Sequence, residues 1–253
     1  MSTVGHPIRH SAFQDAMGEL LRSGDYSDLT ITCGGYVYKV HRAIICPQWH
    51  HLGVFISDSF KGPGDWVLDL PNDNPPTIYR ILDYLYTQDY DDHGFGAQWV
   101  SPKEGVLYRP GPDPENFQRC PIALQVPRNN IMVYLTAEKY GFSSLMSLAA
   151  EKLGHWAGIY RRSIAFVDIL EEVLTLELGR NSKLRGAIVD ASVDHIHELI
   201  ERDEFVKLTT QFPDFGSEVL TLVVKNKLSE QRHRLREQRN RGREQKKRRR
   251  ERS

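Results

Sequence analysis

The sequence has few of the features that mark secreted, membrane or disulfide-stabilised proteins. Only three cysteines occur in 253 residues, Cys33, Cys46 and Cys120, and their odd number and irregular spacing imply no disulfide framework. No apolar run approaches the roughly 18 residues that a membrane-spanning helix needs. The N-terminus lacks an apolar segment of signal-peptide length, which argues against secretion. We therefore expect a reducing compartment and no membrane partner.

Motifs for common catalytic and cofactor chemistry are also missing. The chain has no Gly-x-x-x-x-Gly-Lys-Ser/Thr loop, no Gly-x-Gly-x-x-Gly fingerprint, no His-Glu-x-x-His motif and no Gly-x-Ser-x-Gly elbow. Cys46 and His50 have the i, i+4 spacing of two metal ligands on a helix, but Pro47 disturbs a helix there. We predict a non-enzymatic protein with no catalytic residues, metal or cofactor.

The net charge of zero hides two oppositely charged parts. Residues 225–253 contain 14 Lys/Arg and 4 Glu, a net charge of +10. The preceding 224 residues hold 19 Lys/Arg against 29 Asp/Glu, a net charge of −10. An acidic body with a basic tail indicates that the tail meets a polyanion or a transport receptor.

The N-terminal half alternates between helical and strand periodicity. Phe13, Met17, Leu20 and Leu21 fall on one face of an amphipathic helix, which Ser23-Gly24-Asp25 ends. Residues 29–33 and 36–40 alternate in polarity and are joined by Gly34-Gly35, which predicts an antiparallel hairpin. Residues 66–70 alternate in the same way and are expected to form a third strand.

Helical patterns account for most of the remaining chain. They occupy residues 78–86, 133–140 and 145–156, and then almost everything from 163 to 224. Residues 88–128 instead hold six of the 13 prolines and show no sustained period. A stretch of this length without a pattern is unusual inside a domain, so we interpret it as a surface insertion.

Five short segments, in this order and at these intervals, resemble the BTB/POZ domain family, in particular its fungal members. They are Ser27-Asp28-Leu29-Thr30-Ile31, Val40-His41-Arg42-Ala43-Ile44-Ile45, Leu70-Pro71-Asn72-Asp73-Asn74-Pro75, Tyr84-Leu85-Tyr86-Thr87 and Tyr134-Leu135-Thr136-Ala137-Glu138-Lys139-Tyr140. The resemblance implies an α+β fold of short antiparallel strands flanked by helices. It also implies a role in protein–protein assembly.

Two groups of residues take an expected role from this resemblance. The helix before the first strand often packs across a dimer axis in the family, which would place Phe13, Met17, Leu20 and Leu21 in a homodimer interface. The alternative is that this face packs on its own subunit. Asp28 and Arg42 match a charged pair that lines a pocket at the dimer floor, or else Asp28 caps a strand and Arg42 is solvated. His41 is expected to be a hydrogen-bonded structural residue.

Some members of the family act as adaptors of cullin-based ubiquitin ligases. They commonly carry a hydrophobic residue, any residue and then Glu before the third strand. Here the corresponding residues are Phe60-Lys61-Gly62, so Phe60 is a possible cullin-facing residue but the Glu is absent. A cullin-adaptor function is therefore an alternative to simple self-association and recruitment of partner proteins.

The basic tail ends in the run Lys246, Lys247, Arg248, Arg249 and Arg250. Such a run is typical of a nuclear import signal or of a nucleic-acid contact, or it is merely solvated. Import gives the nucleus as the expected location, with the cytoplasm as the alternative. Glutamates recur every seven residues, but only Leu228 and Leu235 are apolar at that period, too few for a coiled coil. We expect a frayed helix.

The expected organisation is thus a short disordered N-terminus, an interaction domain and two C-terminal parts. The ranges are 1–11 for the disordered segment, 12–156 for the BTB/POZ domain with its insertion at 88–128, 157–224 for an all-helical extension and 225–253 for the basic tail. A nucleic-acid-associated regulator acting through the tail is the third functional hypothesis.

Overall fold

The computed structural model describes residues 11–49, 66–93, 124–176, 178–179 and 181–250. By its internal contacts the chain divides into two compact units, with the boundary between Trp156 and Ala157. The first unit contains all of the strands found among the described residues, and the second is helical. The expected fold class, α+β followed by a helical extension, is confirmed.

The first unit opens with helix α1 (Ala12–Ser23), whose ends are both capped. Ser11 and Gln14 form a capping box, in which each side chain accepts a hydrogen bond from the other residue's backbone N–H. Gly24 ends the helix in the left-handed conformation at φ 68°. A side chain there would be strained, and its Cβ would lie 2.9 Å from Cβ of Lys39.

The predicted hairpin is present as β1 (Leu29–Cys33) and β2 (Tyr36–Val40). Both glycines between the strands have positive φ, as a tight two-residue hairpin turn requires. The third strand, β3 (Val67–Asp69), pairs with β1 in parallel, so the sheet order is β2-β1-β3. The expectation of antiparallel strands therefore holds for the hairpin and is wrong for the third strand.

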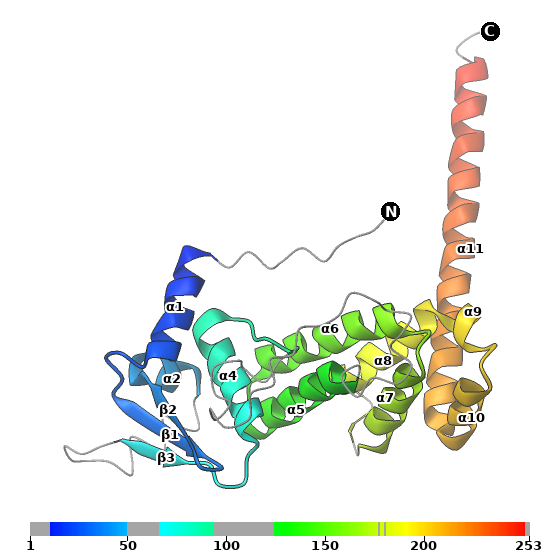
Figure 1. The fold of residues 1–253 in the computed structure, drawn as a ribbon. Helices are drawn as coiled ribbons and strands as arrows, with labels where there is room; N and C mark the ends of the chain where they lie inside the picture. The colour runs from blue at the N-terminus through cyan, green and yellow to red at the C-terminus, as the bar shows by residue number, and fades with distance from the viewer. Residues whose placement is uncertain (1–10, 50–65, 94–123, 177, 180, 251–253) are drawn as a thin grey trace. The chain divides into compact units, whose positions relative to one another are not determined.

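Helices cover one face of this sheet and form the core with it (Figure 1). Ile31 of β1 and the helix residues Ile45, Ile81 and Leu82 are fully buried. The helices of this unit are α2 (Arg42–Gln48), α4 (Pro75–Thr87), α5 (Gln125–Tyr140) and α6 (Ser143–Tyr160). Helix α4 lies between the sheet and the α5–α6 pair, and it contacts α1, α2 and α5.

The expected insertion at 88–128 is too wide at both ends. Tyr90 is 3% exposed and Asp92 is 8% exposed, so the residues after α4 belong to the packed unit. At the other end, helix α5 begins at Gln125 and buries Pro127. Periodicity missed this because the segment is held by hydrogen bonds between polar groups and not by a repeating apolar face. Residues 94–123 lie outside the described residues.

The second unit packs four helices against the beginning of a fifth. Phe205 and Phe215 are both almost fully buried, and their rings meet edge to face at 6.1 Å between centroids. Helix α11 contacts α8 and α10. The elements are α7 (Ile164–Thr175), α8 (Lys183–Asp194), α9 (Ile196–Leu199), α10 (Asp203–Gln211) and α11 (Pro213–Arg250).

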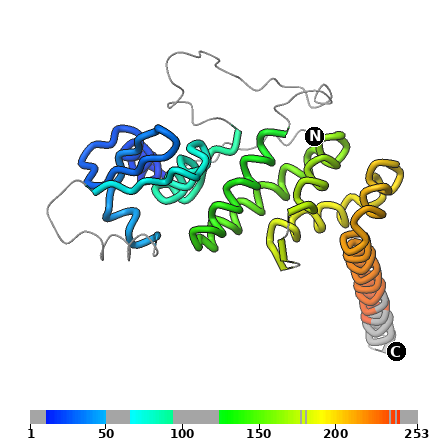
Figure 2. The backbone as a smooth tube through the Cα atoms, turned by 90° about the horizontal axis from the view of Figure 1, so that it is seen from below, coloured from blue at the N-terminus to red at the C-terminus, as the bar shows by residue number. Residues whose placement is uncertain are grey.

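Helix α11 is 38 residues long and continues as one element to Arg250 (Figure 1). Figure 2 shows the first part of this helix from another side. The sequence predicted a frayed helix for the basic tail that continues from residues 219–228, and the backbone of the tail is indeed helical and continuous with those residues. Pro213 starts the helix, where its missing N–H costs no hydrogen bond. None of the described helices, α11 included, is both long enough and apolar enough to cross a membrane.

Candidate interaction surfaces

Helix α1 is fixed to α4 by one side and leaves the other open. Gln14 donates a hydrogen bond of 2.7 Å to the carbonyl of Thr87, and Gly18 allows close approach to the same residue. Leu21 is 5% exposed, so it belongs to the core of its own unit. Phe13, by contrast, is 70% exposed.

Leu21 is one of the four residues expected at a dimer interface, but it has almost no exposed surface that a partner could cover. Met17 and Leu20 are half-buried. The open apolar face of α1, which we call the α1 face, consists of Phe13, Met17 and Leu20. The sequence period identifies one face of the helix but does not separate the residues that pack inward from those at its edge.

Asp28 and Arg42 are in contact, but through a backbone group. Asp28 Oδ1 accepts a 2.7 Å hydrogen bond from the backbone N–H of Arg42, the first residue of α2. The carboxylate therefore caps the N-terminus of α2, where negative charge is favourable. Within the described part of the chain, no ion pair joins the two side chains.

The guanidinium of Arg42 instead lies on an aromatic ring. Its Cζ is 3.9 Å from the ring centroid of Trp66, a cation–π contact. The Nε atom of Arg42 is buried and has no hydrogen-bond partner. Burial raises the pKa of the nearby Cys46 thiol, and Arg42 opposes that shift. The group is therefore a half-buried cation on a tryptophan beside a free thiol.

His41 is a structural histidine, as expected. Its Nε2 lies 2.6 Å from the carbonyl of Asp25, which can only accept, so Nε2 carries the hydrogen. Its Nδ1 then accepts from the Tyr86 hydroxyl at 2.7 Å, and that hydroxyl accepts from the His41 backbone N–H. Burial raises the pKa of Tyr86 to about 12, so this phenol keeps its hydrogen. The imidazole connects the turn after α1 to helix α4.

A buried polar network, which the sequence did not reveal, holds residues 89–92 against three helices. Asn130 of α5 is 0% exposed, accepts from the Tyr90 hydroxyl at 2.6 Å and donates to Asp92 at 2.9 Å. Lys152 of α6 pairs with Asp89 at 2.8 Å. The buried Arg80 of α4 donates to the carbonyl of Asp91. The only signal in the sequence was a polar side chain on the apolar face of a helix, as at Asn130 of α5.

One group of side chains in the described ranges has the ligand types and spacing for a metal ion: Asp91, Asp92 and His93. Both oxygens of Asp92 are already engaged, Oδ1 with His93 Nδ1 at 2.8 Å and Oδ2 with Asn130. Hydrogen bonds from His93 and Asn130 hold the pKa of Asp92 low despite its burial. These contacts account for the cluster as part of the network above.

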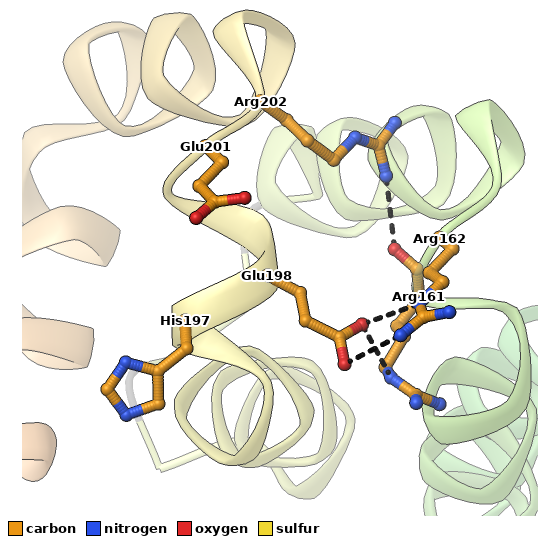
Figure 3. A pocket seen from close by; sticks show the side chains of 6 residues that line it. All are labelled: Arg161, Arg162, His197, Glu198, Glu201 and Arg202. Atoms are coloured by element: carbon orange, nitrogen blue, oxygen red, sulfur yellow. Dashed lines mark hydrogen bonds and ion pairs between the residues drawn. The ribbon is translucent and has the colours of Figure 1, made fainter.

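The second unit contains a cleft of about 420 Å³ rich in arginine (Figure 3). Glu198 binds both Arg161 and Arg162, and Arg162 first and Arg161 second lower its pKa to about 2. Arg202 donates to the carbonyls of Arg161 and Ser163, beyond the end of α6. The remaining lining residues are His197 and Glu201. Arg161, Arg162 and Glu198 pair with one another, and the lining residues include no Ser, Thr or Cys that could act as a nucleophile.

Three sets of expected residues lie outside what the structure describes. Phe60, the possible cullin-facing residue, is outside the described residues, and so is His50 of the Cys46–His50 spacing. For Lys246, Lys247, Arg248, Arg249 and Arg250 only the helical backbone is described.

The first unit thus combines a small mixed sheet with helices that pack around α4. Residues 17–97 match the model of the BTB/POZ domain family. The N-terminal unit therefore contains a BTB/POZ domain at residues 17–97. BTB/POZ domains bind other proteins, so the chain carries a protein-interaction module.

Proposed function

We propose that this chain is a non-enzymatic module that self-associates through the α1 face and recruits further proteins. The observation that carries the proposal is the exposure of Phe13, which is 70% on a helix whose other side packs on α4. A large aromatic side chain at the surface beside half-buried Met17 and Leu20 is typical of an interaction site.

A stable dimer requires burial of the whole α1 face. Full burial of a Phe side chain contributes roughly 1.5–3 kcal/mol, and two copies would contribute about twice that. Association costs an estimated 4 kcal/mol or more in lost translational and rotational freedom. Phe13 alone therefore does not hold a dimer, and Met17 and Leu20 must be covered with it.

The test is the molar mass of the full chain in solution, measured by light scattering over a range of concentrations. Phe13→Asp should weaken the dimer by at least about tenfold, because burying a charge there is costly. Ile200→Asp is the matched control, since Ile200 is 55% exposed in the second unit. A wild-type monomer, or equal effects of the two variants, would refute assembly through the α1 face.

A cullin-adaptor function is the second candidate for the same domain. It is supported by Phe60 in the sequence and by the helical second unit, which offers additional surface. A cullin pull-down with wild-type protein and Phe60→Ala separates it from simple self-association. Capture that depends on Phe60 would establish the adaptor function, and no capture would exclude it.

The basic end of α11 supports nuclear localisation through an import receptor. Its five consecutive cations, residues 246–250, have the composition of an import signal. Deletion of residues 243–253 should move the protein from nucleus to cytoplasm in cell images. An unchanged distribution would refute an import role, and salt-sensitive binding to random DNA would favour nucleic-acid association instead.

A further inference from the structure

The exposed part of α11 contains a sequence repeat of seven residues. The three units are Leu-Ser-Glu-Gln-Arg-His-Arg at 228–234, Leu-Arg-Glu-Gln-Arg-Asn-Arg at 235–241 and Gly-Arg-Glu-Gln-Lys-Lys-Arg at 242–248. Each has Glu third, Gln fourth, a cation fifth and Arg seventh. Because the structure makes residues 213–250 one helix, the repeat marks a constant set of helix faces.

In coiled-coil notation, the residues that would contact a partner helix carry no charge, and the residues beside them do. Positions a and d, which would form the seam, are uncharged in all three units. The flanking positions e and g are basic without exception. The seam residues are Val224, Leu228, Gln231, Leu235, Gln238, Gly242 and Gln245, and the flanking cations are Lys225, Lys227, Arg232, Arg234, Arg239, Arg241, Lys246 and Arg248. We call this arrangement the basic heptad ridge.

The structure shows that the beginning of the ridge is open. Val224 and Leu228 are each 47% exposed, and Leu220 one turn earlier is 64% exposed. These three lie at i, i+4 and i+8, so they continue one apolar stripe along the helix. The four cations from Lys225 to Arg234 at the flanking positions are all exposed.

Within the described side chains of the ridge, the helix neutralises little of its own charge. Arg234 and Glu230 are 4.0 Å apart, the limit of an ion pair. Thirteen Lys/Arg against three Glu between residues 225 and 250 leave a net charge of +10. Such a helix is intrinsically destabilised by like-charge repulsion and gains stability from a negatively charged partner.

We propose that the basic heptad ridge binds an amphipathic helix of another protein that carries Asp or Glu at its own flanking positions. Flanking charges set partner choice in coiled coils. Pairing of α11 with a second copy of itself is disfavoured in both orientations. In a parallel pair, position e of one helix faces position g of the other. In an antiparallel pair, e faces e and g faces g. Each arrangement places cation against cation. The apolar residues of the seam are too few to hold a coiled coil by themselves, so complementary charges at the flanking positions must supply both the stability and the selectivity of the contact.

The pattern favours a helix over nucleic acid as the occupant. Phosphates attract cations wherever they lie on a helix, and they gain nothing from covering Leu220, Val224 and Leu228. In every unit, the repeat has uncharged residues along the seam and a glutamate on the side of the helix away from the seam. No aromatic residue follows Phe215 in α11, so base stacking is not available.

The test measures binding of the full chain to a synthetic four-heptad peptide with Leu at a and d and Glu at e and g. Binding is followed by fluorescence anisotropy at physiological salt, and the helicity that the peptide gains on mixing by circular dichroism. The wild-type chain should bind this peptide at least about tenfold more tightly than a scrambled peptide of equal composition, because only the ordered peptide presents its charges in register.

Two triple variants locate the contact. Lys227→Glu, Arg232→Glu and Arg234→Glu change flanking positions and should weaken binding at least about tenfold. Arg236→Glu, Arg243→Glu and Lys247→Glu change the total charge equally on the other faces and should weaken binding no more than about threefold. Equal losses in the two variants, or binding to duplex DNA as tight as to the peptide, would show a non-specific polyanion site and overturn the proposal. No binding to the peptide would overturn it as well.

Discussion

Asp83 of α4 provides the sharpest test of the energetics of the first unit. Burial and the nearby Asp89 raise the pKa of its carboxyl group from 3.8 to about 6. At neutral pH the folded domain therefore holds an ionised carboxylate in surroundings that favour the neutral acid. Asp83→Asn keeps the shape of the side chain and removes the charge.

The sign of the effect follows from proton binding. Between about pH 4 and pH 6 the folded state binds more protons at Asp83 than the unfolded state does. The free energy of unfolding of the wild type therefore falls as the pH rises through this window. Below it, both states are protonated and the penalty vanishes. Above it, the penalty is constant.

The magnitude can be bounded. A pKa difference of roughly two corresponds to about 3 kcal/mol, and partial contact of the carboxyl group with solvent reduces this to about 1–2 kcal/mol. Asp83→Asn should therefore raise the free energy of unfolding by about 1–2 kcal/mol at pH 7.5 and leave it nearly unchanged at pH 4.

Urea unfolding followed by tryptophan fluorescence is the appropriate assay. All four tryptophans belong to the first unit, with Trp156 at its boundary, so the signal reports chiefly on that unit. Glu151→Gln, an exposed position of α6, is the control for loss of one negative charge. A gain that persists undiminished at pH 4, or no gain at pH 7.5, would refute the placement of Asp83 in a desolvating environment.

Three further substitutions test other contacts. Gly24→Ala should lower the free energy of unfolding by about 1–2 kcal/mol in the same urea assay, because alanine at positive φ is strained and its Cβ meets Lys39. Asn130→Leu should cost about 2–4 kcal/mol, since it leaves the Tyr90 hydroxyl and Asp92 without their partner; a cost below 1 kcal/mol would contradict the network. Arg202→Met should increase hydrogen exchange at the α6–α7 junction, where it removes two hydrogen bonds to carbonyls, and unchanged exchange there would contradict that role.

Elements governed by local rules were predictable from the sequence. The Gly34-Gly35 turn and the alternation on either side of it specify the hairpin, and Asn74 followed by Pro75 specifies the start of α4. Asn74 indeed accepts a hydrogen bond from the backbone N–H of Thr77. Each of these signals depends only on residues that are close together in the sequence.

Features that depend on distant partners were not predictable. The parallel pairing of β3 with β1 joins residues that are far apart in the sequence, such as Ile31 and Leu68. The position of the Arg42 guanidinium likewise depends on Trp66. The network around Asn130 joins groups about 40 residues apart, which no periodicity reveals.

The Asn129–Asn130 pair has a consequence for how this domain tolerates change in length. Asn129 and Asn130 both hold Asp92, just before residue 94, and they lie a few residues after residue 123. The described chain before residue 94 and the described chain after residue 123 are thus joined to each other by these hydrogen bonds. Since closing a longer loop between fixed ends costs little extra free energy, the sequence between them is a natural place for a tag or reporter domain.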